Sequence, residues 1–128
     1  MACGWLLHTT LTLGALLQTY MGHTDIVTIA NYFVSSGLKN SGYEFVNSDE
    51  GWEQKQRDKT TQRIVPGSSF GGSDAGMKAL VAQIHSLGMK IGLYGAASGV
   101  TCGTMPGTLY HEDLDAQTYA DWGIDYRE

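Results

Sequence analysis

Two adjacent acids followed closely by a tryptophan are the residues of this chain best suited to chemistry. The segment Asn47-Ser48-Asp49-Glu50-Gly51-Trp52 follows a short apolar stretch with strand character. Carboxylates accept hydrogen bonds from sugar hydroxyls, and an indole ring packs against the C–H face of a pyranose. A carbohydrate site is therefore one interpretation. The other is structural, with Asp49 and Glu50 capping a turn and Trp52 covering the core.

A cysteine in a glycine-rich loop is the second candidate. Cys102 lies in Thr101-Cys102-Gly103-Thr104-Met105-Pro106-Gly107, shortly after a strand-like stretch that ends at Tyr94. It could act as a nucleophile if a nearby base lowered the pKa of its thiol. We find no such base, because His85 and His111 are best interpreted as surface residues of predicted helices. A structural disulfide or a role in lining a ligand site is favoured. The histidines show no metal-ligand spacing, so no metal site is predicted.

Three helix–strand units are predicted to position these candidates. Helices are expected over residues 26–34, 74–87 and 113–122, the third with Ala116, Tyr119 and Ala120 facing inward. A glycine follows each helix, which is the usual way to end one. Strands are then expected at 43–48, 90–94 and 124–126. This alternation is typical of a parallel α/β sheet, whose function lies on the loops that leave the C-terminal ends of the strands.

The connections differ in length at the two ends of the expected sheet. Each turn from a helix to the next strand is short, whereas the loops 49–73 and 95–111 are long. Loops of that length within a compact domain are usually functional or disordered. The first loop also holds a loose group of basic residues, which we interpret as part of a solvated surface: Lys55, Arg57, Lys59 and Arg63.

Size and charge narrow the possibilities. The chain has 128 residues, enough for one domain but not for a closed barrel of eight βα units, which takes about 250. The formal net charge of −5, with 8 scattered basic residues, argues against binding to nucleic acid. Residues 1–22 are interpreted as a degenerate secretory signal, with a residual first strand and helix as the alternative. No segment is predicted to cross a membrane, and a secreted protein is expected.

A collinear series of motifs resembles a known family. Gly42-Tyr43-Glu44-Phe45-Val46-Asn47, the two acids with the nearby tryptophan, and Arg57-Asp58 stand in order and at matching spacing. They are followed by Gly76-Met77-Lys78-Ala79-Leu80, Ile84-His85-Ser86-Leu87-Gly88-Met89-Lys90-Ile91-Gly92-Leu93-Tyr94, Thr101-Cys102-Gly103, Pro106-Gly107-Thr108-Leu109 and Asp115-Ala116-Gln117-Thr118-Tyr119-Ala120-Asp121-Trp122-Gly123-Ile124-Asp125-Tyr126. Over residues 26–126 the chain is similar to secreted fungal α-galactosidases, retaining glycosidases grouped with the α-N-acetylgalactosaminidases.

The resemblance implies a fold, an activity and a set of site residues. The fold would be the N-terminal part of a TIM barrel, about three βα units that do not close alone, within a partial hydrolase domain at 23–128. The activity would be retaining hydrolysis of terminal α-D-galactose in oligosaccharides or galactomannan side chains, with no metal or cofactor. The expected substrate-binding residues are Asp49, Glu50, Tyr94 and Cys102. In the family the cysteine that Cys102 matches is disulfide-bonded to one after the catalytic strand.

Three departures from the family pattern lie within the chain. Glu50 replaces the second aspartate of the pair, and its extra methylene is expected to crowd a tight sugar pocket. Gly51 replaces a cysteine whose N-terminal partner block is not recognisable. Ala96 stands where an aspartate occurs in many relatives.

A fourth departure concerns the catalytic residues. The family's strand continues after the equivalent of Tyr126 into the block that supplies the nucleophile and the partner of Cys102. The resemblance therefore places the nucleophile, and the acid/base after it, beyond Glu128. We expect an unpaired Cys102, no catalytic residue up to Glu128, and no hydrolysis by the chain alone.

Two alternatives stay open from the sequence. The chain could be a non-catalytic galactose-binding or interaction protein, which would need a partner to cover its open sheet. It could also be a small α/β enzyme that uses Cys102 as its nucleophile. The sequence does not distinguish a galactose from an N-acetylgalactosamine preference.

Overall fold

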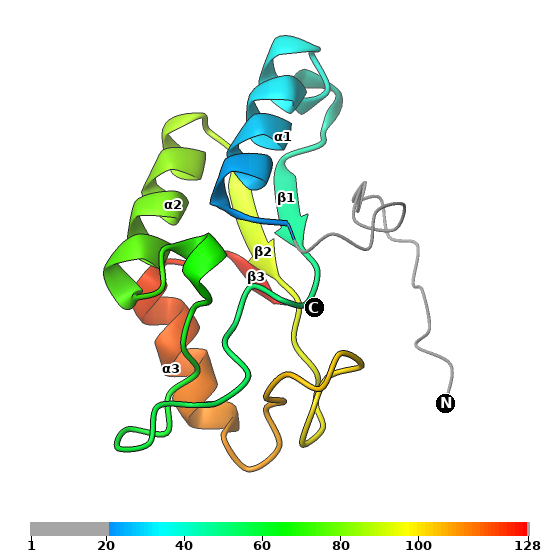
Figure 1. Cartoon of the computed structure of the whole chain (residues 1–128). Coiled ribbons are helices and arrows are strands. Elements are labelled where there is room, and N and C mark those ends of the chain that lie inside the picture. The colour runs from blue at the N-terminus through cyan, green and yellow to red at the C-terminus, as the bar shows by residue number, and fades with distance from the viewer. Residues whose placement is uncertain (1–20, 128) are drawn as a thin grey trace.

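The computed structural model describes residues 21–127 and shows three parallel strands alternating with three α-helices (Figure 1). In chain order the elements are α1 (His23–Ser35), η2 (Lys39–Ser41), β1 (Phe45–Ser48), η3 (Ser68–Phe70), α2 (Asp74–Ser86), β2 (Lys90–Leu93), α3 (Glu112–Trp122) and β3 (Tyr126–Arg127). The sheet order is β1-β2-β3. This open α/β arrangement confirms the predicted fold class.

Two of the sequence predictions fall outside the described residues. Nearly all of the predicted signal segment, residues 1–22, precedes them. Glu128, the residue beyond which the nucleophile and the acid/base are expected, follows them. The signal and the position of the catalytic pair relative to Glu128 therefore stay predictions.

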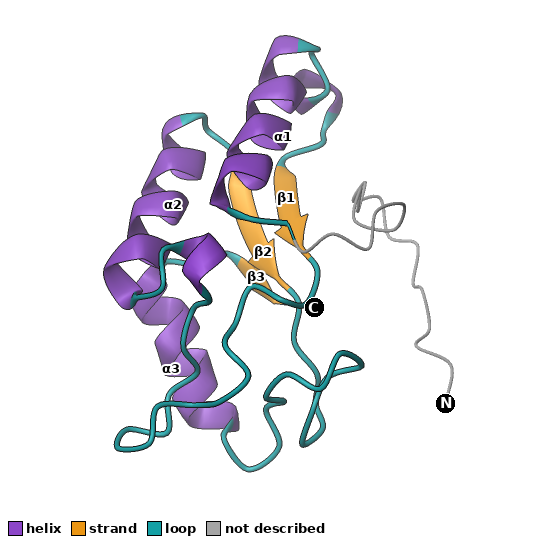
Figure 2. Cartoon of the chain, in the orientation of Figure 1, coloured by secondary structure: helices purple, strands orange, loops and turns teal. Residues whose placement is uncertain are grey.

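The sheet is short, and its register decides which side chains meet. Val46 pairs with Ile91 and Ser48 with Leu93, while Gly92 pairs with Tyr126. Helix α1 packs against β1 and α2, and α2 packs against β2 and α3, as Figure 2 illustrates. The buried members of the strands therefore share a core with the inner faces of the helices. Within residues 21–127 no helix has the length and apolarity needed to span a bilayer.

Helix α2 follows directly from its apolar spacing. Met77, Leu80, Val81 and Ile84 are all buried, as their i, i+3, i+4, i+7 pattern predicts. The Ser73 hydroxyl accepts a hydrogen bond from the Gly76 amide at 3.2 Å, which caps the helix start. The glycine rule also holds at all three junctions, because Gly37, Gly88 and Gly123 have φ between +66° and +82°.

Helix α3 buries Tyr119 as predicted, but the rest of its inward face differs from the prediction. Ala116 and Ala120 are exposed, and the buried residues are Asp115, Thr118, Tyr119 and Trp122. These four also follow i, i+3, i+4, i+7 spacing, but the first of them is an acid. The prediction was wrong for the two alanines because it counted only apolar residues as inward, whereas Asp115 is buried with an ionic partner from a distant loop.

Three aromatic side chains join the first long loop to the helix layer. Trp52, from the start of that loop, meets Tyr119 and Trp122 of α3 edge to face, with all three centroid distances at 5.9 Å. Edge-to-face contacts of this kind add to the free energy gained by burial. The indole of Trp52 is therefore part of the core, and the interpretation that it stacks on a sugar is wrong for this structure.

Candidate functional site

The predicted acid pair lies at the C-terminal end of β1, where the first long loop begins. One Asp49 carboxylate oxygen, Oδ1, accepts a hydrogen bond from the Glu50 amide at 2.7 Å. The Ser48 hydroxyl donates to the Asp49 carbonyl at 3.0 Å. Both acids are half-buried. The turn is thus partly self-satisfied, while a carboxylate keeps further lone pairs for an external donor.

Glu50 reaches across to the second long loop. Its Oε2 accepts a hydrogen bond from the Gly103 amide at 2.8 Å, next to Cys102 in the chain. A Cβ atom at Gly103 would lie 2.8 Å from Oε1 of Glu50, so a larger residue there would require the Glu50 carboxylate to shift. Glu50, which stands where the resemblance has an aspartate, therefore links the two loops. The structure brings Glu50 and the Cys102 segment together, as the parallel-sheet argument predicts.

Tyr94 lies at the end of β2, beside the acid pair's strand. Its amide donates to the Ser48 carbonyl at 2.9 Å, and its carbonyl accepts from Nε1 of Trp52 at 2.9 Å. The tyrosine backbone is thus fixed from both sides by the segment that carries Asp49 and Glu50. Three of the predicted site segments, those of β1, β2 and the second loop, meet at one edge of the sheet.

The expectation of an unpaired Cys102 is wrong. The residue is exposed and forms a disulfide. A disulfide sulfur has no thiol proton to lose, so Cys102 is not the nucleophile of a small thiol enzyme. The structural interpretation of this residue, which sequence reasoning favoured, is the one that the structure supports.

A third acid at this end was not singled out from the sequence. Glu53 is only 4% exposed, and its Oε2 accepts a hydrogen bond from the Gly51 amide at 3.1 Å. Burial raises the pKa of Glu53 to about 7, with smaller contributions from the charges of Glu50 and Asp49 and an opposing effect of backbone hydrogen bonds. No pattern in the sequence marks Glu53 as buried. Its position directly after Trp52, which is itself buried, is the one indication.

A buried ion pair joins the two long loops to α3. The two terminal guanidinium nitrogens of Arg57, Nη1 and Nη2, each donate to an oxygen of the Asp115 carboxylate at 2.6 Å, and the Thr108 hydroxyl donates to the same carboxylate at 2.7 Å. Arg57 also donates to the carbonyls of Gln62 and Gly107. The prediction that Arg57 belongs to a solvated surface is wrong, since this pairing removes it from water. Lys55 and Lys59 are exposed, as predicted.

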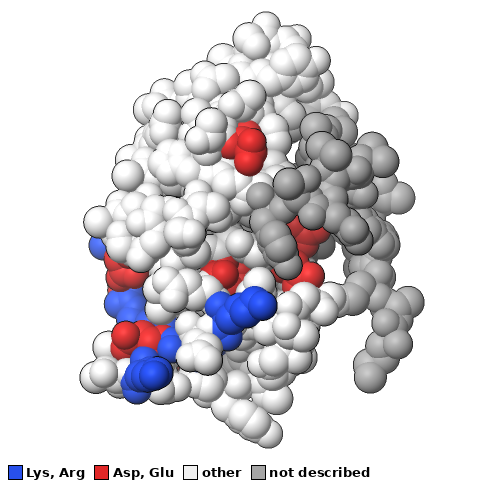
Figure 3. Space-filling model, in the orientation of Figure 1, with Lys and Arg blue, Asp and Glu red and all other residues white. Residues whose placement is uncertain are grey.

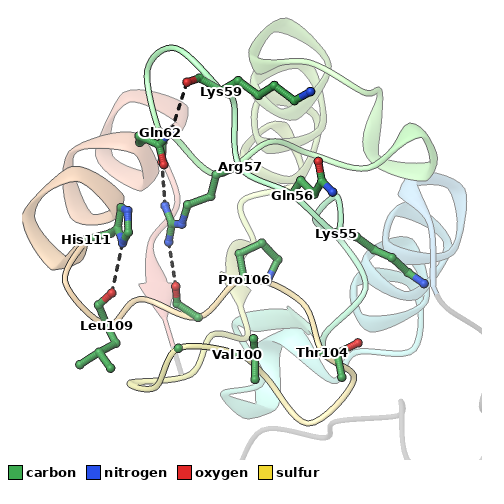
Figure 4. Close-up of a pocket in the computed structure, with 12 residues that line it drawn as sticks. Lys55, Gln56, Arg57, Lys59, Gln62, Val100, Thr104, Pro106, Leu109 and His111 are labelled. Carbon is green, nitrogen blue, oxygen red and sulfur yellow. Dashed lines mark hydrogen bonds between the residues drawn. The ribbon is translucent and has the colours of Figure 1, made fainter.

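A shallow pocket of about 390 Å³ lies between the two long loops (Figure 4). The pocket is lined by basic residues and by uncharged residues, with no acid among them: Lys55, Gln56, Arg57, Lys59, Gln62, Gly99, Val100, Thr104, Pro106, Gly107, Leu109 and His111. None of the four predicted site residues lines it. In Figure 4 the guanidinium of Arg57 is directed to its carbonyl partners, and the chains of Lys55 and Lys59 extend away from the centre.

Charged side chains gather at the same end on one face of the molecule. On the face shown in Figure 3, acidic and basic side chains alternate over the lower part, formed by the long loops and α3, while the upper part is mostly uncharged. Among residues 21–127 no group of three His, Cys, Asp or Glu side chains could hold a metal ion. The carboxylates of Asp49 and Glu50 at this end can accept hydrogen bonds from a polar ligand.

Comparison with known proteins identifies the relationship. A family model described as alpha galactosidase A matches residues 18–128. The chain belongs to the alpha-galactosidase family. It is 48% identical over 104 residues to a "Probable alpha-galactosidase B" of Aspergillus fumigatus, covering 80% of this chain and 24% of that protein. Alpha-galactosidase 2 of Arabidopsis thaliana is 43% identical over 110 residues, covering 85% of this chain and 27% of that protein.

Solved structures show the same relationship in three dimensions. Alpha-galactosidase I from Mortierella vinacea matches with a TM-score of 0.78 and 37% identity, covering 85% of this chain and 28% of that one. An alpha-galactosidase from Saccharomyces cerevisiae, solved with raffinose, matches with a TM-score of 0.77 and 27% identity, covering 84% and 23%. The three strands and helices correspond to the N-terminal part of the family's TIM barrel. The chain spans about a quarter of the length of these relatives.

Proposed function

We propose that this chain supplies part of the galactose-binding site of a retaining α-galactosidase. The substrates would be α-galactosides, either oligosaccharides or the side chains of a galactomannan. The observation that carries the proposal is the Glu50–Gly103 hydrogen bond at 2.8 Å, which joins two strand-end loops in a chain of this family. Function in βα-barrels resides at this end of the sheet.

The proposed roles follow from the contacts of each residue. Oδ1 of Asp49 accepts the Glu50 amide. Because a carboxylate has about four acceptor sites in all, the remaining sites of Asp49 can accept hydrogen bonds from sugar hydroxyls. Glu50 binds through the oxygen that remains beside its bond to Gly103. Tyr94, fixed by its backbone at the end of β2, and the disulfide of Cys102 would line the pocket.

Binding and hydrolysis are separable in this proposal. Retaining hydrolysis needs a nucleophile and an acid/base about 5 Å apart across the glycosidic bond. Asp49, Glu50 and Glu53 lie near the end of β1, and each accepts a hydrogen bond from a backbone amide. We assign the first two to sugar binding and the catalytic pair to sequence beyond Glu128. We therefore expect no turnover from the 128-residue chain by itself.

The test combines an activity assay with calorimetry on the 128-residue chain. We expect no release of chromophore from a chromogenic α-galactoside, and a heat of binding with galactose that Asp49→Ala abolishes. Asp113→Ala removes an exposed acid from α3 and serves as the matched control, because it should leave the heat unchanged. Turnover that Asp49→Ala abolishes would show that the chain is itself a hydrolase. A folded sample that gives no heat with galactose would remove both the proposed roles and the binding-protein alternative.

We extend the proposal to location, because residues 5–17 have the apolar character of a secretory signal. Expression of the chain in a secreting fungal host should release it into the medium. Retention inside the cells would contradict this part of the proposal.

A further inference from the structure

The backbone around Glu53 is held rigidly on both sides. Glu53 forms an antiparallel bridge with Pro66, and hydrogen bonds flank it on either side, from the Gly67 amide to the Trp52 carbonyl at 2.7 Å and from the Gln54 amide to the Val65 carbonyl at 2.8 Å. The preceding side chain, Trp52, is locked in the aromatic core. The Glu53 carboxyl therefore projects from a fixed point.

That fixed carboxyl holds the peptide bond after Glu50. Its Oε2 accepts the Gly51 amide at 3.1 Å, and Gly51 has φ of +97°, a conformation that disfavours other residues. The amide of Gly51 and the carbonyl of Glu50 belong to one planar unit, so holding one orients the other. Glu50 in turn accepts the Gly103 amide, and Asp49 accepts the Glu50 amide. The buried Glu53 carboxyl is thus connected, through the Gly51 amide, to the segment that carries both acids.

The charges of Asp49 and Glu50 are unfavourable to the ionised form of Glu53. Asp49 and Glu50 lie on the same loop, and Tyr119 of α3 packs close enough for its own pKa to respond to the Glu53 charge. The Arg127 guanidinium lies 5.7 Å from the Tyr119 ring centre, on β3. Among residues 21–127 no ion pair joins Glu53 to a cation. A proton on this carboxyl is consequently retained to higher pH than on an exposed one.

We propose that Glu53 is a positioning residue that holds the Asp49–Glu50 segment through the Gly51 amide, and that this hold depends on its protonation. An ionised carboxylate accepts an amide hydrogen bond about twice as strongly as a neutral carboxyl does. Loss of the proton therefore tightens the Gly51 contact and adds a third negative charge beside Asp49 and Glu50. The role rests on the proposed function only in taking sugar hydroxyls as what those two acids bind.

The test is an NMR pH titration of the full 128-residue chain without any sugar, so that its outcome is independent of galactose binding. The Glu53 side-chain carbon and the Gly51 amide proton should titrate together with a midpoint near pH 7. The Gly103 amide should show a smaller step with the same midpoint, because Glu50 connects it to Gly51. A Glu53 midpoint near 4.5, or a Gly51 amide without a step near neutral pH, would overturn the proposal.

Two variants separate positioning from mere presence of an acid. Glu53→Gln should abolish the step at Gly51 and Gly103, whereas Glu53→Asp should keep a titrating acid but shrink the Gly51 step, because the side chain is shorter. The matched control is Glu112→Gln. Glu112 accepts the amide of the residue two positions earlier, Tyr110, at the same 3.1 Å, but it is exposed. It should leave the Gly51 step unchanged, and a Gly51 step that survives in Glu53→Gln would contradict the role.

Discussion

The two ends of the sheet are built on different physical principles. At the end where helices turn into strands, the connections are short, a left-handed glycine follows each helix, and the His85–Asp125 contact at 2.7 Å lies near the surface above an apolar interior. At the opposite end, two long loops are joined to each other and to α3 by directional contacts. These are the Glu50–Gly103 hydrogen bond and the Arg57–Asp115 ion pair, while the Glu53–Gly51 hydrogen bond holds the first loop internally.

The difference determines how each end responds to change. Burial of apolar surface is not directional, so the loss from a core substitution depends on the volume removed. Hydrogen bonds and ion pairs at the loop end fail when one partner is lost, since the other is then left unsatisfied in a poorly hydrated place. We expect buried polar contacts of the loop end to respond strongly to single substitutions and to pH, and the apolar positions of the helix layer to respond to the volume removed and not to pH.

The largest effect is expected at the buried ion pair. Asp115→Ala leaves the Arg57 guanidinium, whose side chain is 10% exposed, without its anionic partner. Removing one partner of a buried pair costs about 4 kcal/mol, so the free energy of unfolding in urea should fall by about that amount. Asp121→Ala is the control on the same helix, because Asp121 pairs with Arg63 at the surface. Equal losses from the two variants would show that the Arg57 pair is not special.

In the helix layer the corresponding change is Ile84→Ala. Ile84 is fully buried on α2, and removing its side chain should cost about 3 kcal/mol through lost burial and a residual cavity. The loss should be the same at acidic and at neutral pH, because no ionisable group is exposed or removed. Lys78→Ala, at an exposed position of the same helix, should have little effect. A loss of stability for Ile84→Ala that varies with pH would contradict the expected difference between the helix layer and the loop end.

The sequence predicted the helix layer well because its determinants are local. The four buried residues of α2 lie within eight positions, and the glycines that follow the helices are read directly. The strands were placed within a few residues of their observed bounds. The end of the sheet that carries the acid pair and Tyr94 was also predictable, because parallel strands all present their C-terminal ends at one edge.

The polar contacts of the loop end were not predictable, because their partners are distant in the chain. Arg57 and Asp115 are 58 positions apart, and Glu50 and Gly103 are 53 apart. Without the partner, Arg57 resembles a solvated cation and Asp115 resembles an outward-facing helix residue. Glu53 was missed for the same reason, since its bridge to Pro66 and the contact of its neighbour Trp52 with α3 join segments that are distant in the chain. The identity of the residues was visible, but their surroundings were not.

The pH dependence of stability offers a further comparison, through the titration of one buried carboxyl at the loop end, Glu53. The folded pKa of Glu53 is about 7 against an ordinary 4.5, so between these values the folded chain holds a proton that the unfolded chain has lost. Its contribution to stability is therefore complete below about pH 4.5 and is lost as the pH rises through about 7. Relative to wild type, Glu53→Gln should remove a slope of at most about 1.4 kcal/mol per pH unit in that window. Urea unfolding at a series of pH values measures it, and Glu112→Gln should keep the wild-type slope.

The smallest expected effect compares two serines of one helix, one at each end of the molecule. The Ser73 hydroxyl accepts the Gly76 amide at the loop end of α2, where the first amides of a helix have no partner within the helix. Ser86, at the last position of α2, donates to the Gln83 carbonyl, a contact that adds little because it competes with the helix's own bonds. Ser73→Ala should therefore cost about 1 kcal/mol, whereas Ser86→Ala should be nearly neutral. Because both serines are exposed and the substitution is identical, the difference in urea unfolding measures the cap alone. Equal losses of stability in the two variants would show that the Ser73 cap does not stabilise the start of α2. The stabilising role of directional contacts at the loop end would then be limited to the loops and would not include the helix.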